Sequence, residues 1–249
     1  MRDFEGKTAI VTGAGSGIGE AVALGLARRG ARVLATDVNE EAAERVVEAI
    51  ERAGEQGAAM KHDVASAEAA EAAVNLAEER FGALHLAVNN AGVGGDISPV
   101  ADYGIDAWRK VIDINLNGVF YGMKYQIAAI ERAGGGAIVN MASILGSVGA
   151  ANSAAYVAAK HGVLGLTKTA ALEYASRGVR INAVGPGYID TPLLEALEDE
   201  ALAALVGLHP VGRLGSAEEV AEMTLFLLSE RASFVSGSYH LVDGGYTAQ

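Results

Sequence analysis

The sequence lacks cysteine and has no run of basic residues. The absence of cysteine excludes disulfides and thiolate chemistry, which fits a cytoplasmic protein. Aspartate and glutamate outnumber lysine and arginine by 31 to 19, which gives a formal net charge of -12. An acidic chain of this kind disfavours binding to nucleic acid or to anionic membranes, so we expect neither as a partner.

Long apolar runs and clustered histidines are also missing. No run approaches the roughly 18 apolar residues that a membrane span needs. Residues 1–7 lead directly into the apolar run 8–12, so we expect no signal peptide. The five histidines are scattered without ligand-like spacing, and we interpret them as structural, with no catalytic metal. Hydrophobic residues make up 51% of the 249 residues, which is ample for a buried core.

Short apolar runs alternate with helical patterns along the whole chain. This alternation predicts an α/β fold, a single Rossmann-like doubly wound parallel sheet of about seven strands with helices on both faces. No linker or shift in composition divides the chain, so residues 1–249 are expected to form one domain. The predicted strands are 8–12, 32–37, 57–62, 84–88, 137–141, 180–184 and 239–242. The predicted helices are 20–29, 39–53, 66–81, 106–133, 154–176 and one that opens at Ser216.

A glycine-rich loop lies between the first strand and the first helix. Its glycines follow the spacing Gly13-x-x-x-Gly17-x-Gly19, which is wider than the common G-x-G-x-x-G fingerprint. Glycine is also common in turns, so the loop alone is weak evidence. Between a strand and a helix, however, such a loop lets the backbone approach a pyrophosphate at the helix N-terminus. The position therefore predicts dinucleotide binding.

The second predicted strand ends at Asp37, 24 residues after Gly13. A dinucleotide fold places at about this point the carboxylate that hydrogen-bonds the adenosine ribose. The same charge would repel a 2′-phosphate, and neither Val38 nor residues 14–16 include an Arg or Lys to offset it. Asp37 could instead cap the next helix, but Asn39 is also a candidate for that cap. We therefore expect NAD rather than NADP.

Tyr156 and Lys160 are four residues apart in a helical segment, so their side chains should emerge on one face. A neighbouring cation stabilises a phenolate, so we expect Lys160 to lower the pKa of Tyr156 and make it usable as an acid and base nearer neutral pH. Ser143 follows the strand 137–141, at the edge where open α/β sheets bind ligands. A tyrosine and a lysine at this spacing also occur by chance on many solvated helices, so the pair alone does not decide the function.

Together these residues resemble the short-chain dehydrogenase/reductase family in its NAD-type form. The resemblance covers essentially the whole chain. It rests on residues 12–19 as the cofactor loop, Asp63-Val64 as the adenine-contacting pair, 89–92 as the sheet-stabilising motif, Tyr156-x-x-x-Lys160 as the active site, and Pro186-Gly187 with Ile189 and Thr191 as the segment that holds the nicotinamide carboxamide.

The resemblance implies a catalytic tetrad of Asn115, Ser143, Tyr156 and Lys160, whose successive intervals of 28, 13 and 4 residues match the family. Tyr156 would be the acid/base, Lys160 would also bind the nicotinamide ribose, and Ser143 would orient the substrate oxygen. Asn115 would hold a water that relays a proton from Lys160. The alternative for Asn115 is a helix residue that bonds the backbone. The implied cofactor contacts are Gly13, Ser16, Gly17, Ile18, Gly19, Asp37, Asp63, Val64, Asn90, Ala91, Gly92, Tyr156, Lys160, Pro186, Gly187, Ile189 and Thr191.

The segment at about 188–212 is irregular and rich in leucine, which indicates a loop-and-helix substrate lid. We expect the substrate between this lid and the tetrad. Most candidate pocket residues are apolar, which favours a hydrophobic secondary alcohol or ketone exchanging a hydride with NAD(H); several of them could equally pack the lid on the body. The candidates are Gly94, Ile144, Val148, Asn152, Tyr188, Leu193, Leu194 and Leu197.

The resemblance also bears on assembly. The family is usually tetrameric through helices such as 106–133 and 154–176, and the second of these is apolar on most faces, so either both layers of the fold or another subunit should cover it. We expect a homotetramer. Residues 244–249 resemble the ending of family members in which the C-terminal carboxylate, here that of Gln249, helps to bind a structural Mg²⁺; a simple interface strand end is the alternative.

Two other functions compete with this interpretation. A 3-oxoacyl carrier-protein reductase usually goes with NADP and a basic docking patch, and both Asp37 and the acidic balance speak against it. A dinucleotide-binding scaffold without turnover would have no need of Tyr156 and Lys160 together.

Overall fold

The computed structural model describes residues 2–192, 194 and 198–248. Its strands form one sheet in the order β3-β2-β1-β4-β5-β6-β7, and every neighbouring pair is parallel. The predicted doubly wound sheet is thus confirmed. The strands are β1 (Thr8–Thr12), β2 (Arg32–Asp37), β3 (Gly57–Lys61), β4 (Leu86–Asn89), β5 (Gly136–Met141), β6 (Val179–Pro186) and β7 (Tyr239–Val242).

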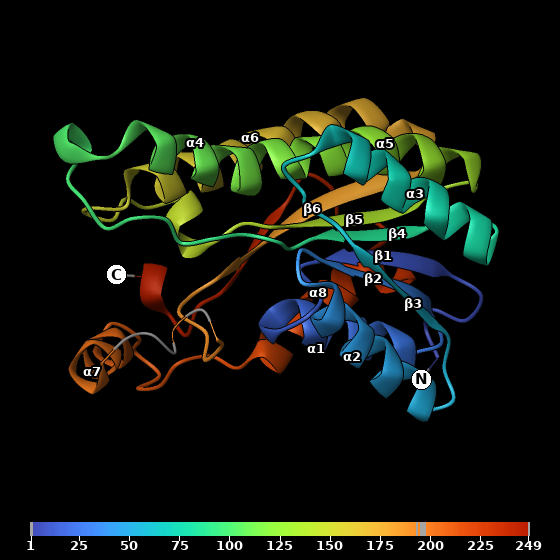
Figure 1. The fold of residues 1–249 in the computed structure, drawn as a ribbon, viewed down its shortest axis with the longest axis horizontal. Coiled ribbons are helices and arrows are strands. Elements are labelled where there is room, and N and C mark those ends of the chain that lie inside the picture. Colours follow the sequence, from blue (N-terminus) through green and yellow to red (C-terminus); the bar gives the residue numbers. More distant parts are fainter. Residues whose placement is uncertain (1, 193, 195–197, 249) are drawn as a thin grey trace.

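Helices cover both faces of the sheet in two layers (Figure 1). One layer holds α1 (Gly17–Arg28), α2 (Glu40–Arg52) and α8 (Ala217–Leu228). The other holds α3 (Ala67–Phe81), α4 (Ile105–Ile112), α5 (Gly118–Arg132) and α6 (Ala154–Tyr174). Each layer buries its own apolar cluster against the sheet, with Val22 and Leu225 in the first and Ile127 and Val163 in the second. All residues of β1 are buried, as expected of a central strand covered on both sides.

The order of the strands reverses beside β1, since β2 lies on one side of it and β4 on the other. The chain connections therefore diverge at this point, and the carboxyl ends of β1 and β4 lie side by side. Ligands of open α/β sheets bind at such a switch point. The fold thus brings the glycine-rich loop after β1 next to the loop after β4.

The long helix expected over 106–133 is interrupted. A π-helical segment, Asp113–Asn117, separates α4 from α5, and Asn115 lies inside it. Such segments are rare and are frequent at functional sites. The described residues of the expected lid include the helix α7 (Asp199–Gly207), which extends away from the body in Figure 1. None of the described helices is long and apolar enough to cross a membrane.

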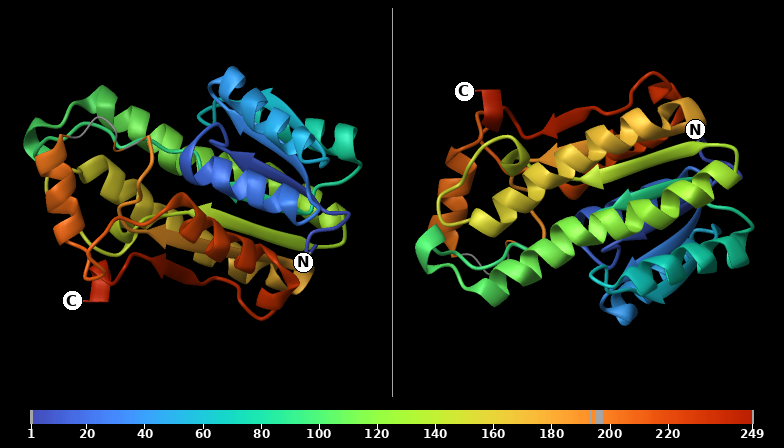
Figure 2. Two further views of the ribbon diagram at one scale, coloured as in Figure 1. Left: turned by 90° about the horizontal axis from the view of Figure 1, so that it is seen from below. Right: turned by 90° about the horizontal axis from the view of Figure 1, so that it is seen from above.

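Helix α6 lies with α4 and α5 on one face of the sheet, as the right view of Figure 2 shows. One stripe of α6, which includes Val163 and Ala170, packs against the sheet. Its opposite side carries Leu172, which is 86% exposed. The two layers of this chain therefore do not cover the whole apolar surface of α6. A homotetramer that covers the rest stays a prediction.

Candidate active site

The glycine-rich loop is held in a conformation that suits glycine. Gly13 and Gly17 have φ angles of +63° and +54°, in the left-handed region. A Cβ added at Gly13 would lie 2.9 Å from the Cα of Ala91, and one added at Gly19 would overlap the carbonyl oxygen of Gly13. Glycine at these two positions therefore lets the loop pack closely on itself and on Ala91.

Helix α1 begins at Gly17, directly after the loop. Ser16 is its N-cap residue, and within the described part of the chain its side chain makes no capping hydrogen bond. The first-turn N–H groups of Gly17, Ile18 and Gly19 have no earlier carbonyl in the helix to bond, and the helix dipole adds partial positive charge there. Thr191, from the segment after β6, lies against Gly17, with its Cγ2 3.2 Å from where a Cβ would stand. This end of α1 fits a pyrophosphate.

The carboxylate of Asp37 ties the end of β2 to this loop. Its Oδ2 atom accepts a hydrogen bond of 2.9 Å from the backbone N–H of Gly15, and its Oδ1 atom accepts one of 3.0 Å from Asn39 N–H. The capping of α2 falls to Asn39, whose side chain accepts from Ala42 N–H. Asp37 therefore stands beside the glycine-rich loop, as a ribose-binding carboxylate requires.

A network of hydrogen bonds joins β1 to the loop after β4. The hydroxyl oxygen of Thr12 accepts from the N–H groups of Asn90 and Ala91 at 3.0 and 3.1 Å. In return, the Asn90 amide donates to the carbonyls of Thr12 and Gly13 at 3.0 and 3.1 Å. Behind it, the Asn89 amide donates to the side chain of Asn140 on β5 at 2.9 Å. These bonds connect three strands, which agrees with a sheet-stabilising motif.

Asn115 is fully buried, and its amide bonds the backbone of Val93. Its Oδ1 atom accepts from Val93 N–H and its Nδ2 atom donates to the Val93 carbonyl, both at 2.8 Å. A Cβ at Gly92 would lie 3.2 Å from Asn115 Oδ1 and 3.7 Å from Lys160 Nζ. Asn115 therefore does bond the backbone, as the alternative interpretation of this residue predicted. The same contacts place it next to Lys160.

Lys160 and Tyr156 lie side by side on α6, as their spacing predicts. The Lys160 ammonium is buried, with its Nζ atom 5.4 Å from the centroid of the Tyr156 ring, and it donates 2.8 Å to the Met141 carbonyl. Burial lowers the pKa of Lys160 from 10.5 to about 8. Burial also raises the pKa of Tyr156, while the Ser143 side chain acts in the opposite direction. The expected lowering of the phenol pKa is therefore wrong for this structure, because desolvation outweighs the hydrogen bond with Ser143.

Ser143 follows β5 and caps a short 3-10 turn, Ile144–Gly146. Its Oγ atom accepts from Leu145 N–H at 3.2 Å, which leaves its own proton available as a donor. Its carbonyl accepts from the hydroxyl of Tyr239 at 2.6 Å. Ser143 is 8% exposed, so the residue is held firmly at the carboxyl end of β5.

The remaining predicted cofactor residues lie at the same edge of the sheet. Asp63 closes the turn after β3 by accepting from Ala65 N–H at 3.0 Å, and Val64 packs against Gly118. Pro186 ends β6. Gly187 donates to the Val242 carbonyl at 3.0 Å, and Ile189 is buried in the first apolar cluster.

The predicted substrate residues differ in how far they are exposed to solvent. Gly94 and Asn152 are exposed, Val148, Tyr188 and Leu194 are half-buried, and Ile144 is 2% exposed, so it serves mainly packing. Leu193, Leu197 and Gln249, and with Gln249 the proposed Mg²⁺ site, lie outside the described residues.

Two side chains of this region had no predicted role. His209, which we interpreted as structural, connects the start of the lid to α7: its Nε2 atom accepts from Tyr188 N–H at 3.2 Å, and its Nδ1 atom lies 2.8 Å from the Leu205 carbonyl. Tyr239 reaches Ser143 from the edge strand β7. Gly185 near the end of β6 was a signal of close approach by another group. Nothing in the sequence says that this group is Tyr239.

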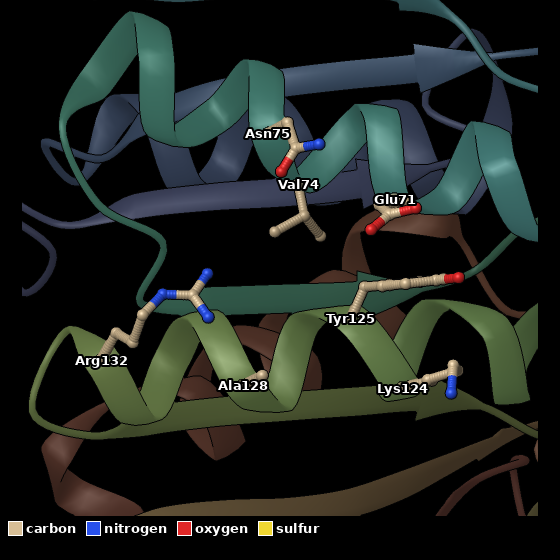
Figure 3. A pocket seen from close by; sticks show the side chains of 7 residues that line it. All are labelled: Glu71, Val74, Asn75, Lys124, Tyr125, Ala128 and Arg132. Carbon is tan, nitrogen blue, oxygen red and sulfur yellow. The ribbon is translucent and has the colours of Figure 1, made fainter.

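A separate hollow of about 230 Å³ lies between α3 and α5, away from these residues (Figure 3). Glu71 on α3 and Arg132 on α5 point toward it from opposite sides. Arg132 also forms an ion pair with Glu78 at 2.9 Å. It is lined by Glu71, Val74, Asn75, Lys124, Tyr125, Ala128 and Arg132. We assign it no role in the chemistry.

The glycine-rich loop at the start of α1 and the side chains of Ser143, Tyr156 and Lys160 thus lie at one edge of a doubly wound α/β sheet. A family model described as enoyl-(acyl carrier protein) reductase matches residues 13–247. The chain belongs to the short-chain dehydrogenase/reductase family.

Individual relatives narrow the reaction. The chain is 55% identical over 246 residues to cyclohexanol dehydrogenase of Acinetobacter sp. (strain SE19), covering 99% of this chain and 97% of that protein. It is 46% identical to cis-4-hydroxycyclohexanecarboxylate dehydrogenase of Sinomonas cyclohexanicum, covering 98% of each. The crystal structure of levodione reductase superimposes with a TM-score of 0.95 at 36% identity, covering 98% of this chain and 99% of that one. The protein is accordingly an oxidoreductase of secondary alcohols and ketones.

Proposed function

We propose that this protein is an NAD-dependent dehydrogenase of hydrophobic secondary alcohols whose hydroxyl stands on a six-membered carbon ring. The observation that carries the proposal is the 55% identity to cyclohexanol dehydrogenase over 99% of this chain. The second relative is also named for a hydroxylated cyclohexane. The site described above supplies the groups that such a reaction needs.

The bound nicotinamide would take the hydride from the carbinol carbon. In the proposal, Tyr156 removes the hydroxyl proton of the substrate as the hydride leaves. Ser143, whose proton is not used by its own turn, donates to the substrate oxygen and stabilises charge on it. Lys160 binds the ribose of the cofactor and keeps positive charge near the phenolate. Asn115, beside Lys160, completes the path of the proton to solvent.

NAD is favoured over NADP by the surroundings of Asp37. Its carboxylate is held against Gly15, where the adenosine ribose is expected, and a 2′-phosphate would meet this charge directly. No Arg or Lys follows it before Arg45. The proposal assigns the pyrophosphate to the N-terminus of α1 and the carboxamide to the segment from Pro186 to Thr191.

An uncharged ring alcohol is favoured over one that carries a carboxylate. The lid segment 188–212 contains no Lys or Arg, whereas it contains five Asp or Glu residues. An anionic group on the substrate would therefore find no opposite charge from the lid. The lid charge therefore favours cyclohexanol over a hydroxycyclohexanecarboxylate as substrate.

The alternatives have less support. A 3-oxoacyl carrier-protein reductase would conflict with the carboxylate of Asp37 and the net charge of -12. A scaffold without turnover would leave the buried Lys160 unexplained, because a buried ammonium is costly to keep without a role. We also propose a homotetramer, which would cover the exposed Phe120 and Leu172 on α5 and α6.

An absorbance assay of NADH formation tests the proposal. Cyclohexanol, a linear secondary alcohol, a hydroxycyclohexanecarboxylate and a polyol would each be offered with NAD and with NADP. We expect the highest kcat/KM for cyclohexanol with NAD. A polyol turned over with far better kcat/KM than cyclohexanol would contradict the proposed substrate class, and a preference for NADP would contradict the role of Asp37.

A further inference from the structure

Tyr239 connects the last strand of the sheet to the catalytic loop. It opens β7, the edge strand beside β6, and its hydroxyl donates a hydrogen bond of 2.6 Å to the backbone carbonyl of Ser143. The two residues are 96 positions apart in the sequence. The bond is shorter than most neutral hydrogen bonds between a hydroxyl and a carbonyl. It therefore fixes the backbone at Ser143 to the sheet edge.

The ring of Tyr239 reaches Ser143 by lying across Gly185. In the register of β6 and β7, Tyr239 stands opposite Ala183, and Gly185 is two residues further along β6. A Cβ at Gly185 would overlap the ring and the hydroxyl of Tyr239. Any other residue at this position would have to push the phenol away from the carbonyl. The absence of a side chain at Gly185 thus makes room for the ring of Tyr239.

The bond acts on a turn that begins directly after Ala142, whose N–H donates to the Val184 carbonyl of β6 at 2.8 Å. The Ser143 carbonyl also accepts from Gly146 N–H at 2.8 Å, and Ser143 Oγ accepts from Leu145 N–H at 3.2 Å. Both of these bonds stay inside the turn, so they set its shape but not its place relative to the sheet. The phenol of Tyr239 supplies a bond from outside the turn. Its loss would leave no buried carbonyl unpaired, because the bond from Gly146 remains.

We propose that Tyr239 is a positioning residue that sets the place and direction of the Ser143 hydroxyl for hydride transfer. The inference rests on the proposed role of Ser143 as the group that binds the substrate oxygen. A small displacement of such a group reduces the rate of the chemical step far more than it reduces folding stability. The predicted effect therefore falls on kcat, with little effect on cofactor binding.

Tyr239→Phe removes the hydroxyl and keeps the ring. We expect kcat for alcohol oxidation to fall about tenfold, since misplacement of a substrate-binding group by a fraction of an ångström has effects of this order. The NADH dissociation constant and the melting temperature should stay close to those of the parent protein. Tyr174→Phe, at the far end of α6, is the matched control and should leave kcat unchanged, because no described residue hydrogen-bonds its hydroxyl.

A double-mutant cycle separates positioning from packing. Gly185→Ala should lower kcat to a similar extent, but should add less than twofold once Tyr239 has been replaced by alanine, since the ring that it displaces is gone. Likewise, Tyr239→Phe should have no further effect in a Ser143→Ala background. A merely structural tyrosine would instead lower the melting temperature and weaken NADH binding together with kcat, and that result would overturn the inference.

The failure of this inference differs from the failure of the proposed function. If Ser143→Ala lowers kcat while Tyr239→Phe does not, only the positioning role of Tyr239 is wrong. If Ser143→Ala leaves kcat unchanged, the proposed role of Ser143 is wrong and the inference about Tyr239 falls with it.

Discussion

The ammonium nitrogen of Lys160 lies 5.4 Å from the centre of the Tyr156 ring and donates its hydrogen bond to the carbonyl of Met141 at 2.8 Å. The lysine is thus held by the end of β5 at the same time as it faces the phenol of its own helix. This geometry keeps a positive charge beside the proposed acid/base at the cost of burying that charge. The cost can be measured.

The burial of Lys160 predicts a pH-dependent stability. Its pKa is lowered by burial to about 8 in the folded protein, while in the unfolded chain it stays near the ordinary 10.5. Between these values the unfolded state binds the extra proton, so stability should rise with pH, by about 3 kcal/mol in total. Lys160→Met should lack this rise. Denaturant unfolding of both proteins between pH 7.5 and 10.5 measures it, and a difference in unfolding free energy that does not change with pH would contradict the prediction.

The contact of Asp37 with Gly15 predicts how cofactor preference can be altered. Asp37→Asn keeps an oxygen for the Gly15 N–H and removes the charge. We expect the ratio of kcat/KM for NAD over that for NADP to fall by about tenfold or more, because one unfavourable charge contact is removed. Asp37→Ala should narrow the preference too, and should also disturb the loop. An unchanged ratio in both variants would show that Asp37 does not bind the ribose.

The polar network behind the site predicts a large stability effect. The Gln126 side chain is 3% exposed and exchanges two hydrogen bonds with the Asn89 amide, at 3.0 and 2.9 Å. Gln126→Ala would leave buried polar atoms of Asn89 with fewer partners, at about 2–3 kcal/mol. Asn117→Ala is the control, since its bond to Asp113 is exposed and should be worth less than about 0.5 kcal/mol. Equal losses in the two variants would contradict this account of the network.

The regular parts of the fold were accessible to prediction because their signals are local. An apolar run such as 8–12, followed by glycines and a helical pattern, specifies a buried strand and its turn from neighbouring residues alone. The same holds for Tyr156 and Lys160, whose proximity follows from helix geometry. The resemblance to a family supplied the roles of residues such as Asn115, which periodicity does not reveal.

The parts that escaped prediction depend on contacts between distant segments. The π-helical segment at Asn115 coincides with its bonds to Val93, and the Tyr239 bond needs β7 beside β6. The pKa of Tyr156 was predicted in the wrong direction because sequence spacing shows the neighbouring cation but not the burial of both groups. Such effects appear only once the layers are packed.

Tyr156→Phe tests the central claim most directly. The kcat for oxidation of cyclohexanol with NAD would be measured in the parent and the variant, together with NADH binding by fluorescence titration. Without the phenol no group is in place to take the substrate proton, so we predict a fall in kcat of about a thousandfold or more with NADH affinity nearly unchanged. A variant that keeps kcat within a few-fold of the parent, or one that loses NADH binding to the same extent as turnover, would contradict the assignment of Tyr156 as the acid and base.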